Sequence, residues 1–489
     1  MSDTFFGRAV KVLMVSAEYA PLAKAGGLAD AVAGLAAALV KRGHDVRVLL
    51  PAYAPGLPTG WSRGAAAVAN ASVFVEASAG RPGPRVYQLD APEIGAGGAV
   101  YAGDDRDAAR FAKLCFAALD LPDAIGWRPD IVHCHDWHAA LVPALLRTAE
   151  APPSLAGART VLTLHNVGYQ GVFPESVLVQ NGLGRLGALV ADEDRADGAV
   201  VFLKIGIRAA DRLTTVSPTY AREIRTPEHG MGLDALLRRR SADLVGILNG
   251  VDYGTWSPET DPFLEHHYGR AAPAGKALVK RALCARLALE NDAPVVGAVS
   301  RLVEQKGIDL LIAAMPALLD STAARFALLG SGDTPLEEAL TALARRHPAR
   351  VAFHRGYDEA LAHLILAGSD LIVVPSRYEP CGLTQLYALR YGTIPVVRAT
   401  GGLADTVVHF DPASGTGNGS VFEHADAQGL IWGLTTALGW HADAALRRRL
   451  IDNAMQADFS WDRQAPEYEK VYAELVGAAP PSDGGTARS

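Results

Sequence analysis

Short apolar segments alternate with stretches of helical spacing along most of the chain, and this alternation restricts the possible folds more than any other feature. In the clearest example, the β-branched run Leu371–Val374 is followed by a polar loop, helical spacing from Pro380 and a second apolar run, Ile394–Val397. Regular strand–helix alternation predicts α/β domains with parallel, doubly wound sheets. The other strands expected from the sequence are Val10–Ala17, Val46–Leu50, Ala71–Glu76, Arg85–Leu89, Ile131–His135, Thr160–Leu164, Leu213–Val216, Val295–Val299, Phe326–Leu329 and Val351–His354.

The length of the chain predicts more than one domain. Its 489 residues are too many for a single hydrophobic core. The polar, Pro-bearing stretch Tyr253–Tyr268 is typical of an inter-domain linker. We therefore expect an N-terminal domain over residues 1–250, a linker over 251–268 and a C-terminal domain over 269–460. Residues 477–489 have the composition of a disordered tail.

Composition disfavours several classes of protein. A net charge of −7 argues against binding to nucleic acid or to an anionic membrane. The four cysteines form no C-x-x-C pair, which is typical of a reduced, intracellular protein without a structural zinc site. No stretch approaches the roughly 18 apolar residues of a membrane span. The apolar run near the N-terminus is broken by Lys11, so we expect no export signal.

A glycine pair follows the first expected strand, at the start of the first expected helix. Gly26 and Gly27 would let the backbone approach a ligand closely, and the helix N-terminus would offer N–H donors. The segment is not G-x-G-x-x-G, and such a turn more often only packs a helix on a sheet. The same five-residue sequence, Gly-Gly-Leu-Ala-Asp, recurs from Gly401. The aspartates of the two copies, Asp30 and Asp405, fall in first helical turns and are assigned structural roles.

Histidines cluster at the end of the strand Ile131–His135. A metal site is one interpretation, but a strand places His133 and His135 on one face and Cys134 on the other, so few ligands converge. We therefore expect no bound metal. Asp136, at the carboxyl end of this strand, is the better candidate for function. A second candidate, His165, ends another strand of the same predicted sheet.

The second half of the chain also carries charged residues just after predicted strands. Glu379 follows a strand and is itself followed by Gly382 and Thr384. A carboxylate beside an anion-binding turn suits a ligand with one hydroxylated and one charged end, such as a sugar nucleotide. Arg301 and Lys306 follow another strand; they are either surface charges or the cations that neutralise a diphosphate.

Taken together, these motifs resemble those of bacterial glycogen synthases and plant starch synthases, which transfer glucose from ADP-glucose to an α-1,4-glucan. The similarity runs from about Val10 to about Leu475. The matching residues are Lys24-Ala25-Gly26-Gly27-Leu28, His135-Asp136-Trp137-His138, His165-Asn166, Asn249-Gly250-Val251-Asp252, Ser300-Arg301-Leu302, Gln305-Lys306-Gly307 and the whole block from Pro375 to Asp405.

The resemblance implies a GT-B fold, with two Rossmann-like domains facing each other across a cleft. It also implies that a helix over residues 461–476 crosses back to the N-terminal domain. The family's catalytic positions correspond to Glu379, His165, Arg301 and Lys306. The positions expected to bind substrate are Lys24 at the donor phosphate, Tyr357 near the adenine, and Gly26, Gly27, Asp136, Asn166, Asn249, Cys381, Gly382, Leu383 and Thr384.

The family retains anomeric configuration, and we expect a same-face, substrate-assisted displacement because no second carboxylate is suitably placed as a nucleophile. We expect no cofactor and, with Lys and Arg on the diphosphate, no metal; the cysteine usage described above agrees with a cytoplasmic location. Two positions differ from a common pattern. Ala25 stands where the family usually has Thr or Val. Tyr387 stands where many related GT-B enzymes have a second Glu, and it matches the glycogen synthase subgroup. The alternatives are a GT-B enzyme that uses UDP-glucose, and a non-catalytic, glucan-binding relative.

Overall fold

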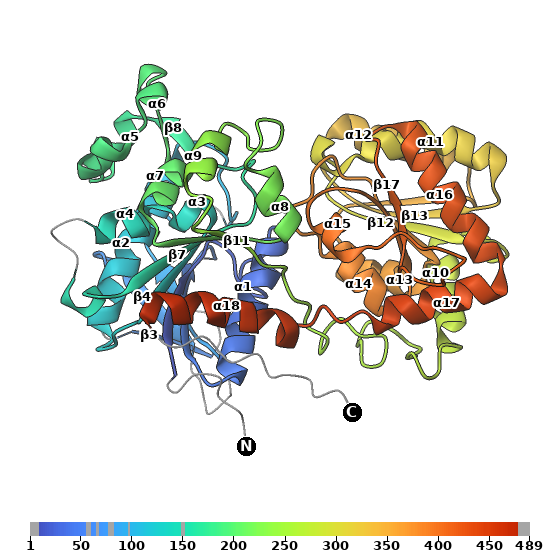
Figure 1. The fold of residues 1–489 in the computed structure, drawn as a ribbon, viewed down its shortest axis with the longest axis horizontal. Coiled ribbons are helices and arrows are strands. Elements are labelled where there is room, and N and C mark those ends of the chain that lie inside the picture. The colour runs from blue at the N-terminus through green and yellow to red at the C-terminus, as the bar shows by residue number, and fades with distance from the viewer. Residues whose placement is uncertain are drawn as a thin grey trace. The chain divides into compact units, whose positions relative to one another are not determined.

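A computed structural model of the chain describes residues 9–54, 60–64, 68–76, 83–95, 98–147 and 152–477 (Figure 1). The chain forms two compact units. Unit 1 comprises Met1–Val216, Ala221–Gly250 and Trp461–Ser489, and unit 2 comprises Ser217–Tyr220 and Val251–Ser460. Apart from Gly477, the predicted disordered tail lies outside the described residues.

Unit 1 is built on a nine-stranded sheet with the order β11-β10-β7-β6-β1-β2-β5-β4-β3. All neighbours from β11 to β5 pair parallel, whereas β5, β4 and β3 pair antiparallel. Strands β1, β2, β6 and β7 are largely buried, as inner strands of a sheet covered on both faces are, whereas the edge strands β3 and β11 are partly exposed. The strands are β1 (Lys11–Val15), β2 (Asp45–Pro51), β3 (Trp61–Arg63), β4 (Ser72–Glu76), β5 (Arg85–Asp90), β6 (Ile131–His135), β7 (Arg159–Leu164), β10 (Arg212–Thr215) and β11 (Leu244–Gly246).

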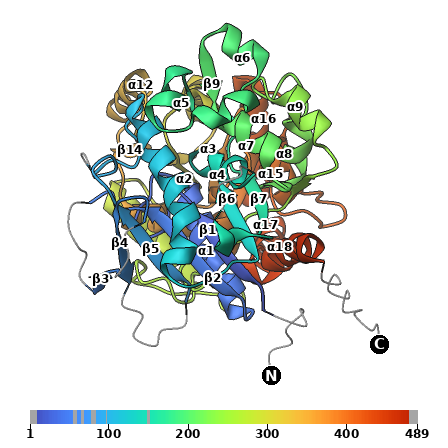
Figure 2. The ribbon, with the colours of Figure 1, turned by 90° about the vertical axis from the view of Figure 1, so that its left-hand side faces the viewer.

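Helices cover this sheet (Figure 2). A separate two-stranded antiparallel sheet is formed by β8 (Val172–Pro174) and β9 (Ala199–Val201). The residues of helix α8 (Pro218–Glu223) are divided between the two units, up to Tyr220 in unit 2 and from Ala221 in unit 1. The other helices of unit 1 are α1 (Gly27–Lys41), α2 (Arg106–Ala124), α3 (Asp136–Ala139), α4 (Leu141–Leu146), α5 (Ser176–Gln180), α6 (Asp192–Ala196), α7 (Phe202–Ala209), α9 (Asp234–Arg239) and α18 (Trp461–Val476), with 3₁₀ turns at Pro153–Leu155 and Gly184–Leu189.

The C-terminal helix α18 packs beside α1 (Figure 1). A side chain on Gly34 of α1 would lie 1.9 Å from Nε1 of Trp461, so only glycine allows this close approach. The contact is also held by charge. The carboxylate of Glu469 accepts two hydrogen bonds of 2.7 Å from Arg42 and lies 2.9 Å from Nε2 of His44. Burial alone would raise the pKa of Glu469, but its bonds to His44 and Arg42 outweigh burial and hold the pKa below its ordinary value.

We expect Glu469→Gln to destabilise the packing of α18 by about 3 kcal/mol, because removal of one partner leaves buried charge uncompensated. This stabilisation is fully present at neutral pH. It begins to decrease when the pH falls below 4.5, the ordinary pKa of a glutamate, and it is lost once the pH has fallen through the lower pKa of Glu469 in the folded protein. Hydrogen exchange of the α18 amides at pH 7 measures the effect. Glu467→Gln, on the same helix, removes only an exposed pair with Lys470 and should change exchange little; equal effects of both variants would contradict the prediction.

Unit 2 contains a six-stranded, fully parallel sheet with the order β14-β13-β12-β15-β16-β17. Its strands are β12 (Val295–Val299), β13 (Arg325–Gly330), β14 (Val351–Arg355), β15 (Leu371–Val374), β16 (Ile394–Arg398) and β17 (Ser420–Phe422). Its helices are α10 (Gly275–Leu287), α11 (Ile308–Ser321), α12 (Thr334–Arg346), α13 (Glu359–Gly368), α14 (Thr384–Arg390), α15 (Gly401–Thr406), α16 (Ala427–Ala442) and α17 (Ala444–Gln456), with a 3₁₀ turn at Glu304–Lys306.

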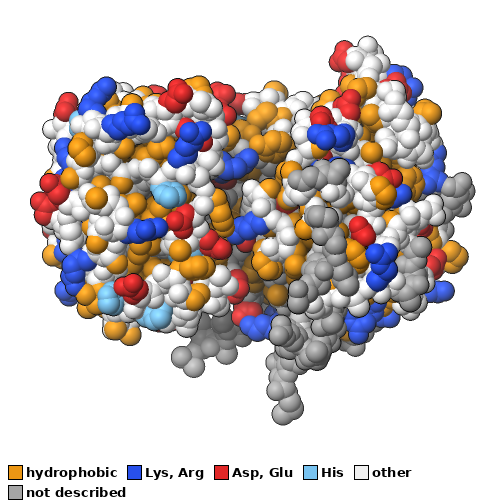
Figure 3. Space-filling view, turned by 180° about the vertical axis from the view of Figure 1, so that it is seen from behind, with side chains coloured by type: hydrophobic (Ala, Val, Ile, Leu, Met, Phe, Trp, Pro, Cys, Tyr) orange, Lys and Arg blue, Asp and Glu red, His pale blue; other side chains and the backbone are white. Residues whose placement is uncertain are grey.

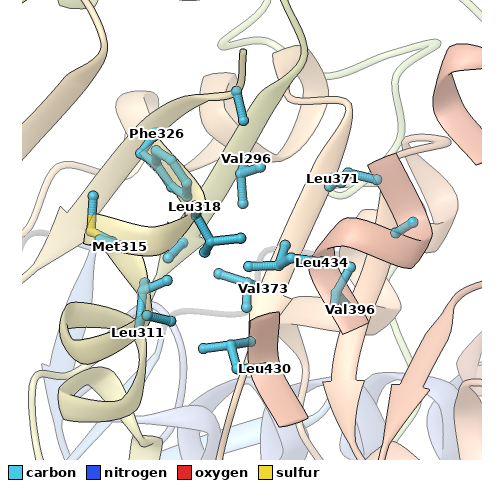
Figure 4. Close-up of a cluster of buried hydrophobic side chains, with 14 of the residues drawn as sticks. Val296, Leu311, Met315, Leu318, Phe326, Leu371, Val373, Val396, Leu430 and Leu434 are labelled. Atoms are coloured by element: carbon cyan, nitrogen blue, oxygen red, sulfur yellow. The ribbon is translucent and has the colours of Figure 1, made fainter. Parts of the chain in front are cut away.

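The core of unit 2 lies between the sheet and two helices, α11 and α16 (Figure 4). On α11, Leu311, Met315 and Leu318 recur at helical spacing and form one apolar stripe. They face side chains of the central strands, and α16 adds Leu430 and Leu434. This burial fixes the register of the strands and therefore the position of the loops that follow them.

The doubly wound α/β architecture predicted from the sequence is confirmed, and each of the predicted strands is present. One boundary differs. Helical spacing predicted a helix from Pro380, but α14 begins at Thr384, because Gly382 adopts a positive φ of 74°. The side chain of Gln385 bonds the carbonyls of Cys381 and Gly382 at 3.0 Å, which holds this segment as a loop.

Within the described part of the chain, no helix has both the length and the apolar character that a bilayer span requires. Lys, Arg, Asp and Glu side chains are intermixed over the visible part of the face in Figure 3. That part of the surface carries no stripe of one sign.

Candidate functional site

In unit 1, the predicted site residues lie at one edge of the sheet. Strands β1, β6 and β7 are parallel neighbours, so the loops that follow them meet at their carboxyl ends. Asp136 directly follows β6, and His165 directly follows β7. The glycine pair Gly26-Gly27 belongs to the loop that follows β1 and opens α1.

The carboxylate of Asp136 links two of these loops. Its Oδ1 accepts a 2.6 Å hydrogen bond from the backbone N–H of His165 and a 3.3 Å bond from that of Asn166. Asp136 itself has a φ of 56°, which is uncommon for a residue other than glycine. Burial raises the pKa of Asp136 to about 7, against the opposing effect of the two backbone bonds. Such a carboxyl group can exchange a proton near neutral pH.

His133, His135 and His165 contact one another in sequence at the ends of β6 and β7. His133 uses both ring nitrogens, one 2.7 Å from the hydroxyl of Tyr472 and one 2.6 Å from that of Thr163. Nδ1 of His135 lies 3.1 Å from Nε2 of His165. Burial lowers the pKa of His133 and of His165 to about 3, so both imidazoles are neutral at physiological pH. Among the described residues, no three His, Cys, Asp or Glu side chains are grouped to hold a metal ion.

The glycine loop is shaped by a carboxylate that the sequence did not single out. Oε2 of Glu18 accepts hydrogen bonds from the amides of Ala25 (2.7 Å) and Gly26 (2.8 Å), and its other oxygen accepts one from the hydroxyl of Tyr101. Lys24, in the same loop, pairs with Asp30 at 3.0 Å. The signal in the sequence was an acidic residue directly after the first expected strand, Val10–Ala17, and eight residues before Gly26, which is weak by itself.

In unit 2, Glu379 is the central residue of the predicted site. It follows β15 and is only 5% exposed. Oε2 of Glu379 lies 2.6 Å from Nζ of Lys306 and accepts a 2.8 Å hydrogen bond from the hydroxyl of Ser376. The sequence placed both charges at strand ends, and the structure joins them into one buried ion pair. Ser376 was missed, although a hydroxyl two residues after a strand is a recognisable signal.

Close backbone approaches fix the loops around this ion pair. A Cβ on Gly307 would lie 2.1 Å from the carbonyl oxygen of Pro375, and one on Gly402 would lie 2.1 Å from that of Cys381. The amide of Gly402 donates a 3.0 Å hydrogen bond to the carbonyl of Glu379. The loops after β12, β15 and β16 therefore support one another, which preorganises the carboxylate.

The remaining predicted residues fall into two groups. In unit 2, Arg301 and Tyr357 are exposed in the loops after β12 and β14, while Cys381 is buried, Gly382 and Leu383 are partly buried, and Thr384 begins α14. In unit 1, Asn166 is partly buried, and its Oδ1 accepts a 2.9 Å bond from Gly168.

Among the described residues at the carboxyl ends of the unit 1 strands, three buried polar atoms have no hydrogen-bond partner: Oδ1 of Asn249, Nε2 of His135 and Nδ1 of His138. Because an unpaired buried polar atom is costly, such atoms are typical of positions where a ligand or water binds.

Comparison with known proteins gives consistent matches. The family model described as "Starch synthase catalytic domain" matches residues 11–239, and "Glycosyl transferases group 1" matches residues 280–457. The chain is 46% identical to a glycogen synthase of Anaeromyxobacter dehalogenans (strain 2CP-C), over 96% of this chain and 100% of the relative. It is 44% identical to glycogen synthase 2 of Agrobacterium fabrum, over 96% and 93%.

Solved structures agree. The catalytic domain of starch synthase IV from Arabidopsis thaliana, bound to ADP and acarbose, superposes with a TM-score of 0.88 at 36% identity, covering 96% of this chain and 100% of that one. A sucrose-phosphate synthase from Thermosynechococcus elongatus shares the fold, with a TM-score of 0.64 at 22% identity.

Proposed function

The chain belongs to the family of bacterial glycogen synthases and plant starch synthases and is a GT-B glycosyltransferase, and from this premise we propose that it transfers glucose from ADP-glucose to the non-reducing end of an α-1,4-glucan. The single observation that best supports a catalytic role is the ion pair of Glu379 with Lys306 at the carboxyl end of β15. A non-catalytic, glucan-binding relative would not need to keep this buried pair of charges, whose desolvation is costly.

The donor is proposed to bind through its diphosphate to cations. Lys306 and Arg301 follow β12 in unit 2, and Lys24 lies in the glycine loop of unit 1. Cations and backbone amides at helix starts suit a diphosphate leaving group. Tyr357 is 74% exposed and offers its ring to the adenine.

The transferred glucose is proposed to lie against uncharged groups of unit 1. The neutral imidazole of His165 can donate or accept a hydrogen bond to a sugar hydroxyl, as can the amides of Asn166 and Asn249. Asp136 holds the His165 backbone in place and, with a pKa of about 7, can exchange a proton with a bound hydroxyl.

In the proposed reaction, the bond between the anomeric carbon and the diphosphate oxygen breaks, and the acceptor hydroxyl oxygen bonds to the same face of that carbon. The acceptor proton moves to the departing phosphate. Positive charge that develops on the sugar is offset by the carboxylate of Glu379, and negative charge on the phosphate is offset by Lys306 and Arg301. Configuration is retained without a covalent enzyme intermediate.

Purified protein incubated with ADP-glucose and a glycogen primer should release ADP and extend the glucan. Competition with UDP-glucose distinguishes the alternative donor, because a UDP-glucose enzyme would turn over that sugar faster. Binding of glucan with no release of either nucleotide would identify a non-catalytic relative. We also propose a cytoplasmic location, which the family implies and with which the absence of a disulfide among Cys115, Cys134, Cys284 and Cys381 agrees.

The backbone contact at Gly402 provides a test of the donor loop. We expect Gly402→Ala to weaken ADP binding by about tenfold, because the added methyl group overlaps the Cys381 carbonyl and must displace the loop that carries Glu379. Isothermal titration with ADP measures this. Gly439→Ala on α16 adds the same methyl group where no atom lies within 4 Å and should leave binding unchanged; a normal affinity in Gly402→Ala would refute the argument.

A further inference from the structure

The two segments of unit 2 that carry the buried ion pair are also bonded to each other beside it. Residues 375–379 follow β15 and end in Glu379, and the 3₁₀ turn Glu304–Lys306 follows β12. The backbone N–H of Arg377 donates a 2.8 Å hydrogen bond to the carbonyl of Gln305. The ion pair is therefore one of several links between these two segments.

The side chain of Arg377 adds further links at the same place. Its Nη1 and Nη2 each donate a 2.7 Å bond to one carboxylate oxygen of Asp309, in the first turn of α11. Nη1 also donates a 2.9 Å bond to the carbonyl of Glu304. Two parallel bonds between a guanidinium and a carboxylate fix the direction of both side chains. The bonds from Arg377 also hold the pKa of Asp309 below its ordinary value, so this carboxylate is ionised at neutral pH.

A second arginine holds the same residues from the neighbouring strand on the other side. Arg398, the last residue of β16, donates a 2.9 Å bond from Nε to the carbonyl of Ser376. Its Nη2 donates to the carbonyl of Arg377. Because β15 lies between β12 and β16 in the sheet, the loop that leads to Glu379 is bonded to the ends of both flanking strands.

The pair of Arg377 with Asp309 suits the fixing of geometry better than it suits stability. The two side chains are 30% and 42% exposed, and ion pairs that are open to water contribute little to folding. Position matters more to a reaction, since a misplacement of about 1 Å at reacting groups can lower a rate by about 10²-fold.

We propose that Arg377 is a positioning residue, which through Asp309 and the Glu304 carbonyl holds Lys306 and Glu379 in the arrangement that the reaction requires. This inference rests on the proposed function. The guanidinium is directed at Asp309 and Glu304. Arg377 should therefore act on the rate of the bound complex and not on the affinity for the donor.

Steady-state kinetics test this role. Arg377→Ala should lower kcat by about 10²-fold, change KM for ADP-glucose by less than about threefold, and leave the melting temperature close to that of the wild type. Arg377→Lys keeps the charge but not the two-pronged geometry, so it should recover only part of kcat. Asp309→Asn weakens the same pair from its other member and should lower kcat by about tenfold.

The matched control is Arg270→Ala, which removes another arginine–aspartate pair of unit 2. Arg270 bonds the two carboxylate oxygens of Asp452 at 2.7 Å and 3.2 Å, and their side chains are 48% and 42% exposed. This variant should leave kcat unchanged. Normal kcat in both Arg377→Ala and Asp309→Asn overturns the proposal. A raised KM for ADP-glucose with normal kcat would show that Arg377 binds the donor directly, and an equal loss of kcat in the control would show a general effect of stability; either result also overturns it.

A double variant tests whether Arg377 acts through Lys306. Arg377→Ala combined with Lys306→Ala should lose less kcat than the product of the two single losses, because the lysine that Arg377 positions is already gone. Losses that multiply in full contradict the proposal. If the wild-type protein turns over neither ADP-glucose nor UDP-glucose, the proposed function itself fails. Hydrogen exchange then reports on the bonding separately: the amides of residues 375–379 should exchange faster in Arg377→Ala than in Arg270→Ala, and equal exchange overturns the inference.

Discussion

Glu379→Gln should lower kcat by roughly 10³-fold or more while the protein remains folded. Gln has the same shape and keeps an oxygen for the hydroxyl of Ser376, but it carries no charge to offset the positive charge on the sugar and leaves Lys306 without its partner. The fold should survive because the loop is held by backbone contacts, including the bond from Gly402 to the Glu379 carbonyl. Initial rates of ADP release and a thermal melt measure the two effects.

The matched control lies at the other end of the same strand. Asp370 directly precedes β15 and is buried in ion pairs with Lys280 at 2.7 Å and His441 at 3.1 Å. Asp370→Asn therefore removes a carboxylate that is only 14% exposed from the edge of the sheet opposite to Glu379. We expect it to lower the melting temperature and to leave kcat near normal. Near-normal turnover in Glu379→Gln, or equal losses of turnover in both variants, would rule out the catalytic assignment.

Much of the fold could be predicted because burial leaves a strong record in the sequence. Runs such as Leu371–Val374 are apolar throughout, as strands covered on both faces must be. The strands that the sequence did not reveal are short and partly exposed, for example Trp61–Arg63 and Leu244–Gly246. The start of α14 was wrong by four residues because Gly382 and the side chain of Gln385 set the loop, and periodicity does not register either effect.

The site was predictable as a set of strand ends but not as a set of contacts. The rule that ligands bind at the carboxyl ends of parallel strands selected Asp136, His165 and Glu379. It could not reveal that Glu379 pairs with Lys306, 73 residues away, because that contact depends on β12 and β15 being neighbours in the sheet. It also could not find Glu18, whose carboxylate shapes the glycine loop, since its two partners in that loop are backbone amides and backbone amides have no sequence signal.

Lys306→Ala should lower kcat by about 10²–10³-fold and weaken ADP-glucose binding much less. The leaving diphosphate gains negative charge as the bond to the sugar breaks, so a cation fixed beside it stabilises the transition state more than the bound donor. Lys306 is fixed by its ion pair with Glu379, which removes the cost of orienting it during the reaction. The same reasoning predicts a loss of kcat in Arg301→Ala. Steady-state kinetics and equilibrium binding of ADP-glucose separate the two quantities.

Lys280 provides the control for this lysine, because its side chain is 19% exposed, as is that of Lys306, and it also pairs with a carboxylate, at the opposite end of β15. Lys280→Ala should affect stability and leave kcat unchanged. The double variant of Lys306→Ala with Glu379→Gln should lose less than the product of the single losses, because each single change already disrupts the same pair. A Lys306→Ala enzyme that binds donor far more weakly yet turns over normally at saturation would show that the lysine only anchors the substrate. If the loss of kcat in the double variant equals the product of the two single losses, the two side chains act separately in spite of the 2.6 Å contact between them. That result would contradict the prediction.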